Sequence, residues 1–296
     1  MPDATPGDLR CTAQARLLGP DPTGTAGSAA SVALVEVALP WPKDVAGAVP
    51  EVAAAAADIG ARLQAIVPDP ARLARGEALV VLHRSPGDGF RGYERHEATV
   101  PVGEVAGALR VLAGGAGPAP GIDVLVCTHG ARDRCCGSLG TTLHQSLRAP
   151  EAVQIHRTSH LGGHRFAPTA LVLPSGTVWA WLDHTVLGAI VEQRVAPADV
   201  MAHYRGSLAM GHPALQVAEA AAFAEVGWDW HDHERRSWWQ EDGGPDRWRV
   251  GIDGTAGSWR AVVERSGTER QPVCGRPLDA ATKTDDRLRL VSAGWA

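Results

Sequence analysis

Short apolar runs alternate with longer segments of helical spacing along most of the chain. Runs rich in β-branched residues and bounded by Pro or Gly predict strands, and these runs span residues 31–39, 77–83, 93–100, 122–127 and 152–156. Apolar positions that recur about every 3.6 residues predict helices, and these span residues 11–18, 49–67, 103–113 and 140–147. Strands that alternate with helices in this way indicate an α/β fold.

The pattern changes beyond residue 160. Two apolar segments, 166–173 and 178–182, flank the turn Pro174-Ser175-Gly176 and predict a hairpin. A helix is predicted next at 215–226, and short strands are predicted at 229–239, 248–252, 259–264 and 288–291. We therefore expect a mixed sheet flanked by helices, the pattern of a thioredoxin-like domain, followed by a small C-terminal β-containing region.

These patterns divide the chain into three parts. Residues 1–30 are rich in Pro, Gly, Thr and Ala and are expected to form a weakly ordered lead-in. Residues 31–195 form the predicted thioredoxin-like domain, and residues 196–296 form a helix with a small β region. Six of the ten tryptophans lie between Trp228 and Trp259. They are interpreted either as the core and edges of that β region or as a partner-binding surface.

Composition narrows the class of protein. The formal net charge of -5 gives no reason to expect binding to nucleic acid or to an anionic membrane. Neither an uncharged apolar stretch of about 18 residues nor a secretory signal is found, so we expect no membrane span and a cytoplasmic protein. Five cysteines in 296 residues are too few for a disulfide scaffold, and clustered cysteines in a reducing compartment favour metal binding or redox chemistry.

Candidate chemistry is concentrated in two short segments. Cys127 ends a predicted strand in CTHGARDRCCG, and His160 and His164 follow in HLGGH. Two thiolates and two imidazoles suit Zn²⁺ or an iron–sulfur cluster. The two histidines are expected on a loop, because the Gly-Gly pair between them disfavours a helix. The eight residues between Cys127 and Cys136 match no common zinc-finger spacing.

Two questions about the cysteines stay open at this point. Spacing alone allows either Cys135 or Cys136 to be the second thiolate ligand, although adjacent side chains diverge and rarely both bind one small cluster. An all-cysteine site would need Cys11 or Cys274 from remote segments. We interpret those two cysteines as incidental. In a further alternative, the cysteines and histidines only pack or hydrogen-bond.

The strings CTHGARDRCCG, SHLGGHRFA and LVLPSGTVW resemble the sucrase/ferredoxin-like family, which is related to thioredoxin-like [2Fe–2S] ferredoxins. The resemblance is strongest over residues 125–181 and extends loosely to the N-terminal strand ALVEVALPWP, residues 33–42, and to residues 202–222. It implies a thioredoxin fold and a [2Fe–2S] cluster with two cysteines on one iron and two histidines on the other. The implied ligands are Cys127, Cys136, His160 and His164, because the family places its second cysteine directly before glycine.

We therefore expect an iron–sulfur protein that transfers single electrons, with protons that can follow the electron, and an unidentified redox partner protein. Histidine ligation should raise the potential relative to four-cysteine clusters. The alternatives are a zinc-stabilised structural or interaction module with the same ligands, or a thiol oxidoreductase that uses Cys135 or Cys136. The second alternative lacks the C-x-x-C motif that such enzymes normally carry. Nothing in the sequence identifies an enzyme: nucleotide-binding glycine motifs and a carboxylate pair for glycoside hydrolysis are not found.

Five nearby side chains have less direct interpretations. His129 is expected to be a loop residue or a neighbour of the ligands, and His156 is expected to be a structural histidine on a strand. Arg132, Arg134 and Arg165 flank the predicted ligands. They are either solvated loop charges or groups that tune the cluster, because positive charge near sulfur stabilises the reduced state.

Overall fold

The computed structural model describes residues 9–87, 89–115 and 117–296. The larger of its two sheets contains β1 (Ser31–Glu36), β2 (Ala61–Ile66), β3 (Glu77–Arg84), β4 (Glu94–Pro101), β5 (Ile122–Cys127), β6 (Val153–Thr158), β7 (Ala170–Leu173), β8 (Thr177–Trp179) and β9 (Tyr204–Ser207). The smaller one contains β10 (Arg235–Glu241), β11 (Arg247–Gly254), β12 (Gly257–Arg270) and β13 (Thr284–Trp295).

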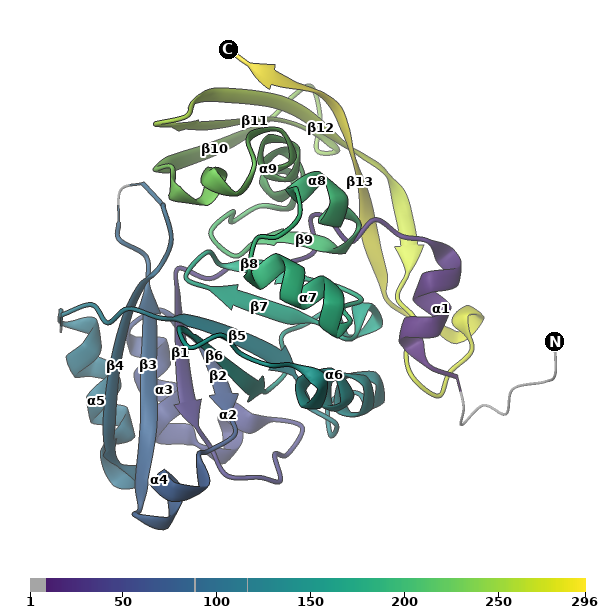
Figure 1. Cartoon of the computed structure of the whole chain (residues 1–296). Coiled ribbons are helices and arrows are strands. Elements are labelled where there is room, and N and C mark those ends of the chain that lie inside the picture. The colour runs from purple at the N-terminus through teal and green to yellow at the C-terminus, as the bar shows by residue number, and fades with distance from the viewer. Residues whose placement is uncertain (1–8, 88, 116) are drawn as a thin grey trace.

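The nine strands of the larger sheet are ordered β4-β3-β1-β2-β6-β5-β7-β8-β9 (Figure 1). Two neighbouring pairs are parallel, β1 with β2 and β5 with β6, and the other neighbours are antiparallel. The smaller sheet is antiparallel throughout, in the order β10-β11-β12-β13. The predicted α/β fold with a mixed sheet and a C-terminal β region is therefore confirmed.

Helices cover both sheets. The described helices are α1 (Cys11–Leu18), α2 (Val45–Ala48), α3 (Pro50–Asp58), α4 (Pro70–Ala74), α5 (Val105–Ala113), α6 (Thr141–Ser146), α7 (His184–Val191), α8 (Pro197–Val200) and α9 (Pro213–Val226). Helices α3 and α5 pack side by side against β1 and β3, where they bury a cluster of Ala, Val and Leu side chains. Short apolar side chains allow this close helix-to-sheet contact.

The predicted helix at 49–67 is wrong in its second half. Helix α3 ends at Asp58, Gly60 takes a left-handed φ of +65°, and β2 follows. Strand β2 pairs in parallel with β1, from Ser31↔Ala61 to Glu36↔Ile66. Apolar spacing in this short segment suits either a helix or a strand, and the hydrogen bonds offered by β1 decide between them.

A smaller error concerns the strand predicted from residue 229. Residues Trp228–Asp232 form a 3-10 turn that buries Trp230, and β10 begins only at Arg235. Strand β10 is tied back to the larger part of the molecule, because Phe90 and Arg235 exchange backbone hydrogen bonds of 2.8 and 3.0 Å.

Helix α9 lies between the two sheets and contacts β9 on one side and β10–β13 on the other (Figure 1). Nine of its residues are buried, including Glu219. The Glu219 carboxylate accepts hydrogen bonds from the Tyr204 hydroxyl at 2.6 Å, Arg235 Nη1 at 3.2 Å and Trp230 Nε1 at 3.3 Å. Burial raises the pKa of Glu219, although Arg235 opposes that rise. The helix is therefore a shared core element, with its one buried carboxylate fully hydrogen-bonded.

The tryptophans of the C-terminal third divide between core and surface. Trp228 packs with Phe223 of α9, at 5.1 Å between ring centroids, and Trp259 is buried. Trp238 and Trp239 on β10 are 39% and 47% exposed. Trp295 on β13 is 42% exposed as well. This region's tryptophans thus both complete the fold and contribute to its surface.

A second buried carboxylate lies near the middle of the larger sheet. Asp123 on β5 is within 2.8 Å of His83 Nε2, 2.7 Å of His156 Nε2 and 2.7 Å of Arg95 Nε. Burial alone would raise the pKa of Asp123, but the two histidine hydrogen bonds hold it well below its usual range. The interpretation of His156 as a structural histidine agrees with this geometry.

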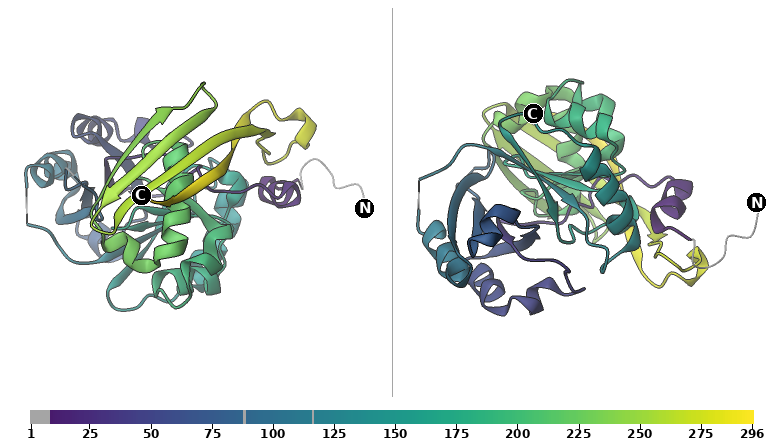
Figure 2. Two further views of the ribbon diagram at one scale, coloured as in Figure 1. Left: turned by 90° about the horizontal axis from the view of Figure 1, so that it is seen from above. Right: turned by 60° about the horizontal axis from the view of Figure 1, so that its bottom comes forward.

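The N-terminal segment lies against the rest of the molecule. Residues 1–8 of the predicted lead-in are outside the described residues, and the predicted helix at 11–18 is confirmed as α1. Figures 1 and 2 both show α1 beside the loop that joins β12 to β13. The predicted domain boundary at residue 195 stays a prediction, and β9, which lies beyond it, belongs to the larger sheet.

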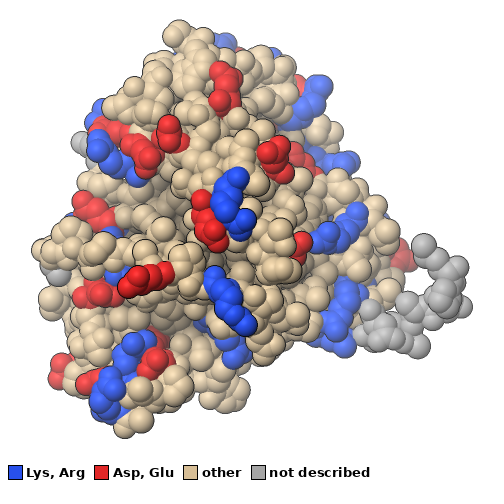
Figure 3. Space-filling view, in the orientation of Figure 1, with Lys and Arg blue, Asp and Glu red and all other residues tan. Residues whose placement is uncertain are grey.

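Surface charge is mixed. On the face drawn in Figure 3, basic and acidic side chains are interspersed, and neither sign forms a continuous patch. Among the described helices, none combines the length and the apolar character that a membrane crossing requires.

Candidate metal centre

Cys127 occupies the end of a buried central strand of the larger sheet. Strand β5 lies between β6 and β7, and its residues from Asp123 to Cys127 are all buried. Strands β5 and β6 are parallel, with Cys127 opposite Thr158. Because parallel strands end at the same edge of a sheet, the segments that follow Cys127 and Thr158 begin side by side.

The segment after Cys127 folds back onto its own start. It leads into a π-helical turn, η3 (Cys136–Gly140), and two glycines in that turn make very close backbone approaches. A Cβ on Gly137 would lie 2.5 Å from the Cα of Gly130, and one on Gly140 would lie 1.9 Å from the Cys127 carbonyl oxygen. Only glycine fits these positions. The turn thereby brings Cys136 back to Cys127.

The segment after β6 carries the two histidines on a loop, as predicted. Gly162 and Gly163 have φ of +89° and +65°, and His164 begins a short 3-10 turn. Two arginines hold the loop by its carbonyl groups. Arg62 donates to Leu161 at 2.8 Å and Arg205 donates to Gly162 at 3.1 Å. Gly163 also makes room for the Arg205 guanidinium, which would lie 2.5 Å from a Cβ at this position.

Three of the four predicted ligands converge. One donor atom each of Cys127, Cys136 and His160 lies within 4.8 Å of the other two. The Cys127 Sγ is 4.0 Å from His160 Nδ1. A hydrogen bond from Cys136 lowers the pKa of the Cys127 thiol well below its usual range, and the neighbouring His160 adds to this effect. The site therefore favours a thiolate, the form of cysteine that binds metals.

The fourth predicted ligand, His164, lies next to this group. Its ring centroid is 6.2 Å from that of His160. Its Nδ1 is 3.2 Å from the Asp133 carboxylate and 3.3 Å from Cys11 Sγ. The carboxylate contact leaves Nε2 as the ring nitrogen available to a metal.

This donor set fits the two-thiolate, two-imidazole group that the sequence predicts. The four side chains are contiguous and supply soft sulfur and borderline nitrogen donors. The two sulfurs are completely buried, whereas the His164 side chain is 25% exposed. A group bound here would therefore meet solvent through its histidine side.

A second group of donors lies beside the first. It consists of Cys11, Asp133, Cys135 and Cys274, whose donor atoms all lie within 4.8 Å of one another. The interpretation of Cys11 and Cys274 as incidental is wrong. Both contact Cys135, because α1 and the loop between β12 and β13 fold onto the segment after β5 (residues 128–136, the cluster loop). Hydrogen bonds from Cys11 and Cys274 lower the pKa of the Cys135 thiol to about 3. No local spacing in the sequence signals this group.

The remaining candidates are near the ligands but make other contacts. His129 Nε2 is 2.9 Å from the Pro42 carbonyl oxygen. Arg132 and Arg134 are both exposed. Arg165 is buried, with its guanidinium 4.1 Å from the Phe166 ring centroid and in an ion pair with Asp285.

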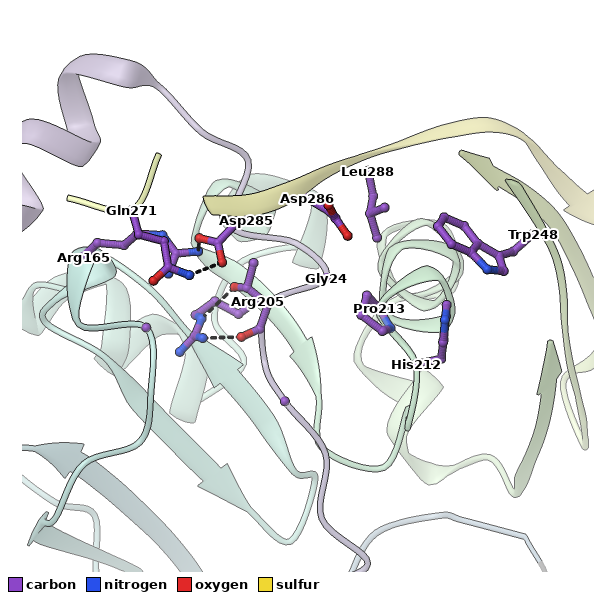
Figure 4. A pocket seen from close by; sticks show the side chains of 13 residues that line it. Gly24, Arg165, Arg205, His212, Pro213, Trp248, Gln271, Asp285, Asp286 and Leu288 are labelled. Atoms are coloured by element: carbon purple, nitrogen blue, oxygen red, sulfur yellow. Dashed lines mark hydrogen bonds and ion pairs between the residues drawn. The ribbon is translucent and has the colours of Figure 1, made fainter. Parts of the chain in front are cut away.

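A cavity of about 440 Å³ opens behind the histidine loop (Figure 4). Its lining includes Gly163, Arg165 and Arg205 as well as His212 and Trp248. Strand β13 crosses above it, where Asp285 contacts Arg165 (Figure 4). The cavity therefore lies where the histidine loop meets the smaller sheet.

The chain has no significant match among curated proteins or among solved structures. The family model described as Sucrase/ferredoxin-like matches residues 22–206, which include all four predicted ligands but neither Cys11 nor Cys274. More than half of the chain lies in this match. The chain therefore belongs to the sucrase/ferredoxin-like family.

Proposed function

We propose that this protein binds one [2Fe–2S] cluster through Cys127, Cys136, His160 and His164 and transfers single electrons. The observation that carries the proposal is the convergence of Cys127, Cys136 and His160 at the ends of two parallel strands. His164 stands next to them on the same loop. When bound, the cluster would supply a one-electron redox centre.

The protein's own groups would orient the ligands and control access to them. Asp133 contacts His164 Nδ1 through one oxygen, and its other oxygen accepts the backbone N–H groups of Cys135 and Cys136 at 2.8 and 3.3 Å. One carboxylate thus links the cysteine segment to the histidine loop. Such contacts fix the orientation of ligands and tune a metal site.

Electrons would enter and leave at the histidine side. Both cysteine ligands are fully buried, and His164 is part-exposed. A redox partner protein would therefore dock over the loop that contains His160 and His164.

The alternatives are less well supported. A thiol that exchanges disulfides must be reached by its substrate, and Cys135 and Cys136 are both 0% exposed. A zinc module using the same four ligands has the same geometry, so the metal content decides that question.

The test is metal and sulfide analysis of the full-length protein purified without oxygen, together with electron paramagnetic resonance after reduction. We expect about two irons and two sulfides per chain, and a spectrum in the reduced form only. Cys136→Ser and His164→Ala should lose the cluster. His184→Ala, a change at an exposed histidine on α7, should keep it.

Three outcomes would contradict the proposal. A colourless protein with stoichiometric zinc on these ligands would support the zinc module instead. Cysteine-dependent turnover without metal would support a thiol oxidoreductase. A cluster lost in Cys135→Ser and retained in Cys136→Ser would overturn the choice of ligand.

A further inference from the structure

Three cysteines from three distant segments meet beside the proposed cluster site. Cys11 is the first residue of α1, Cys135 lies in the cluster loop, and Cys274 lies in the loop between β12 and β13. The Cys274 Sγ is 3.4 Å from Cys11 Sγ and 3.3 Å from Cys135 Sγ. Cys11 and Cys135 are completely buried. The three segments do not belong to one helix or one strand pair, so regular secondary structure does not explain why their thiols meet.

A carboxylate completes the group. Asp133 has oxygens 3.7 Å from Cys11 Sγ and 3.8 Å from Cys274 Sγ. It is buried as well. Three sulfurs and one oxygen, all within 4.8 Å of one another, form the four-donor set that tetrahedral Zn²⁺ accepts.

The distances favour a shared cation over a disulfide. A disulfide bond brings two sulfurs to about 2.05 Å, and the closest pair here is 3.3 Å apart. Sulfurs on a tetrahedral zinc with bonds of about 2.3 Å stand about 3.8 Å apart. The observed separations of 3.3 and 3.4 Å need only a small adjustment to reach that value.

Hydrogen bonds around the group hold the three segments in register. The backbone N–H of Cys11 donates to Cys274 Sγ at 3.4 Å, a contact that stabilises a thiolate. The N–H of Gly275 donates to the Leu9 carbonyl at 2.8 Å, and Arg10 donates to Ser138 Oγ at 2.9 Å. Figures 1 and 2 both show α1 lying against the β12–β13 loop at this point.

We propose that Cys11, Cys135, Cys274 and Asp133 bind a structural Zn²⁺ ion that ties both ends of the chain to the cluster loop. On binding, each of the three thiols gives up its proton and the carboxylate binds as an anion. The site is separate from the cluster site, because the two groups of donors share no residue. Two of its ligands, Cys11 and Cys274, also lie outside residues 22–206, the part that matches the family. Through Asp133, which also contacts His164, the zinc would stiffen the support of the proposed iron ligand.

The experiment measures zinc and iron together in the full-length protein, prepared without oxygen from zinc-replete medium. We expect about one zinc per chain in addition to the cluster iron. Cys274→Ser should lose at least nine-tenths of the zinc and keep its iron. Cys136→Ser should lose its iron and keep its zinc. Val273→Ser, a change at the adjacent part-exposed residue, controls for disturbance of the loop and should keep both metals.

A second measurement does not depend on the folding of a variant. Wild-type protein freed of zinc should bind one Co²⁺ per chain, with the intense visible bands of tetrahedral cobalt–thiolate coordination, and one Zn²⁺ should remove those bands. Wild-type protein with iron but without zinc, and with no cobalt bands, would overturn this proposal and leave the proposed function intact. Zinc that is lost from Cys136→Ser but kept in Cys274→Ser would also overturn it, as would a Cys135–Cys274 disulfide in the anaerobic protein.

Discussion

Replacing Gly163 by alanine tests how the chain holds the loop between the two histidines. Gly162 is a matched control, because it is the neighbouring residue and also has a positive φ, +89° against +65° for Gly163. A side chain in this backbone region costs about 1 kcal/mol. Nothing lies within 4 Å of a Cβ on Gly162, whereas a Cβ on Gly163 would lie 2.5 Å from Arg205 Nη2 and 2.6 Å from its Cζ.

The guanidinium of Arg205 has little freedom to move aside. It is 2% exposed, and it donates to the Gly162 carbonyl at 3.1 Å, to Thr25 Oγ1 at 3.0 Å and to the Thr25 carbonyl. Overpacking of a rigid site costs about 1–3 kcal/mol. Gly163→Ala should therefore destabilise the protein by about 2–4 kcal/mol, and Gly162→Ala by about 1 kcal/mol.

Thermal unfolding provides the assay. In a chain of 296 residues, a change of about 1 kcal/mol corresponds to about 2 °C of Tm. We expect Tm to fall by about 2 °C in Gly162→Ala and by about 4–8 °C in Gly163→Ala. Iron content should fall only in the second variant, because His164 follows the displaced residue directly. Equal decreases in Tm for the two variants would refute the argument that Arg205 fills the space at Gly163.

Three further changes test the buried carboxylates and the cluster loop. Asp123→Asn should cost about 3–5 kcal/mol, because it leaves the buried Arg95 guanidinium with only the part-exposed Glu97 as its anion and removes the charge that His83 and His156 contact. The pKa of Asp123 in the folded protein lies below its ordinary value of 3.8, so this carboxylate stabilises the protein fully above about pH 4. The difference in Tm between wild type and variant should therefore shrink as the pH falls below about 4. A constant difference from pH 7 to pH 3 would contradict this. Arg235→Met should cost about 3–5 kcal/mol, because it leaves Glu219 buried without a cation. The double variant Arg235→Met/Glu219→Gln should recover most of that loss. Equal unfolding free energies of the single and double variants would show that the pair does not interact as described. Gly137→Ala places a Cβ 2.5 Å from the Cα of Gly130, a backbone atom. It should therefore move Cys136 away from Cys127 and lower the iron content. Full iron occupancy in this variant would rule out that close approach.

Local patterns predicted the elements that carry the candidate ligands. The apolar run of residues 122–127 is β5 with the predicted bounds, and Gly162-Gly163 makes the histidine segment a loop. These features depend on residues close in sequence: burial on both faces needs a continuous apolar run, and positive φ needs glycine. The same local reasoning failed for β2, and it missed α7 and β9, because neighbouring strands and the packed core decide those elements.

The sequence by itself determined the α/β alternation, the strand that ends at Cys127, the loop between the histidines and the family. Tertiary structure alone decided that Cys11, Cys135 and Cys274 meet. Cys11 and Cys274 are 263 residues apart, yet their sulfurs lie 3.4 Å from each other and next to Cys135. Spacing rules describe donors on one turn or loop, whereas this group forms only because α1 and the β12–β13 loop both fold onto the cluster loop. Contacts of that kind depend on how the packed elements are arranged in space, and no local pattern records that arrangement.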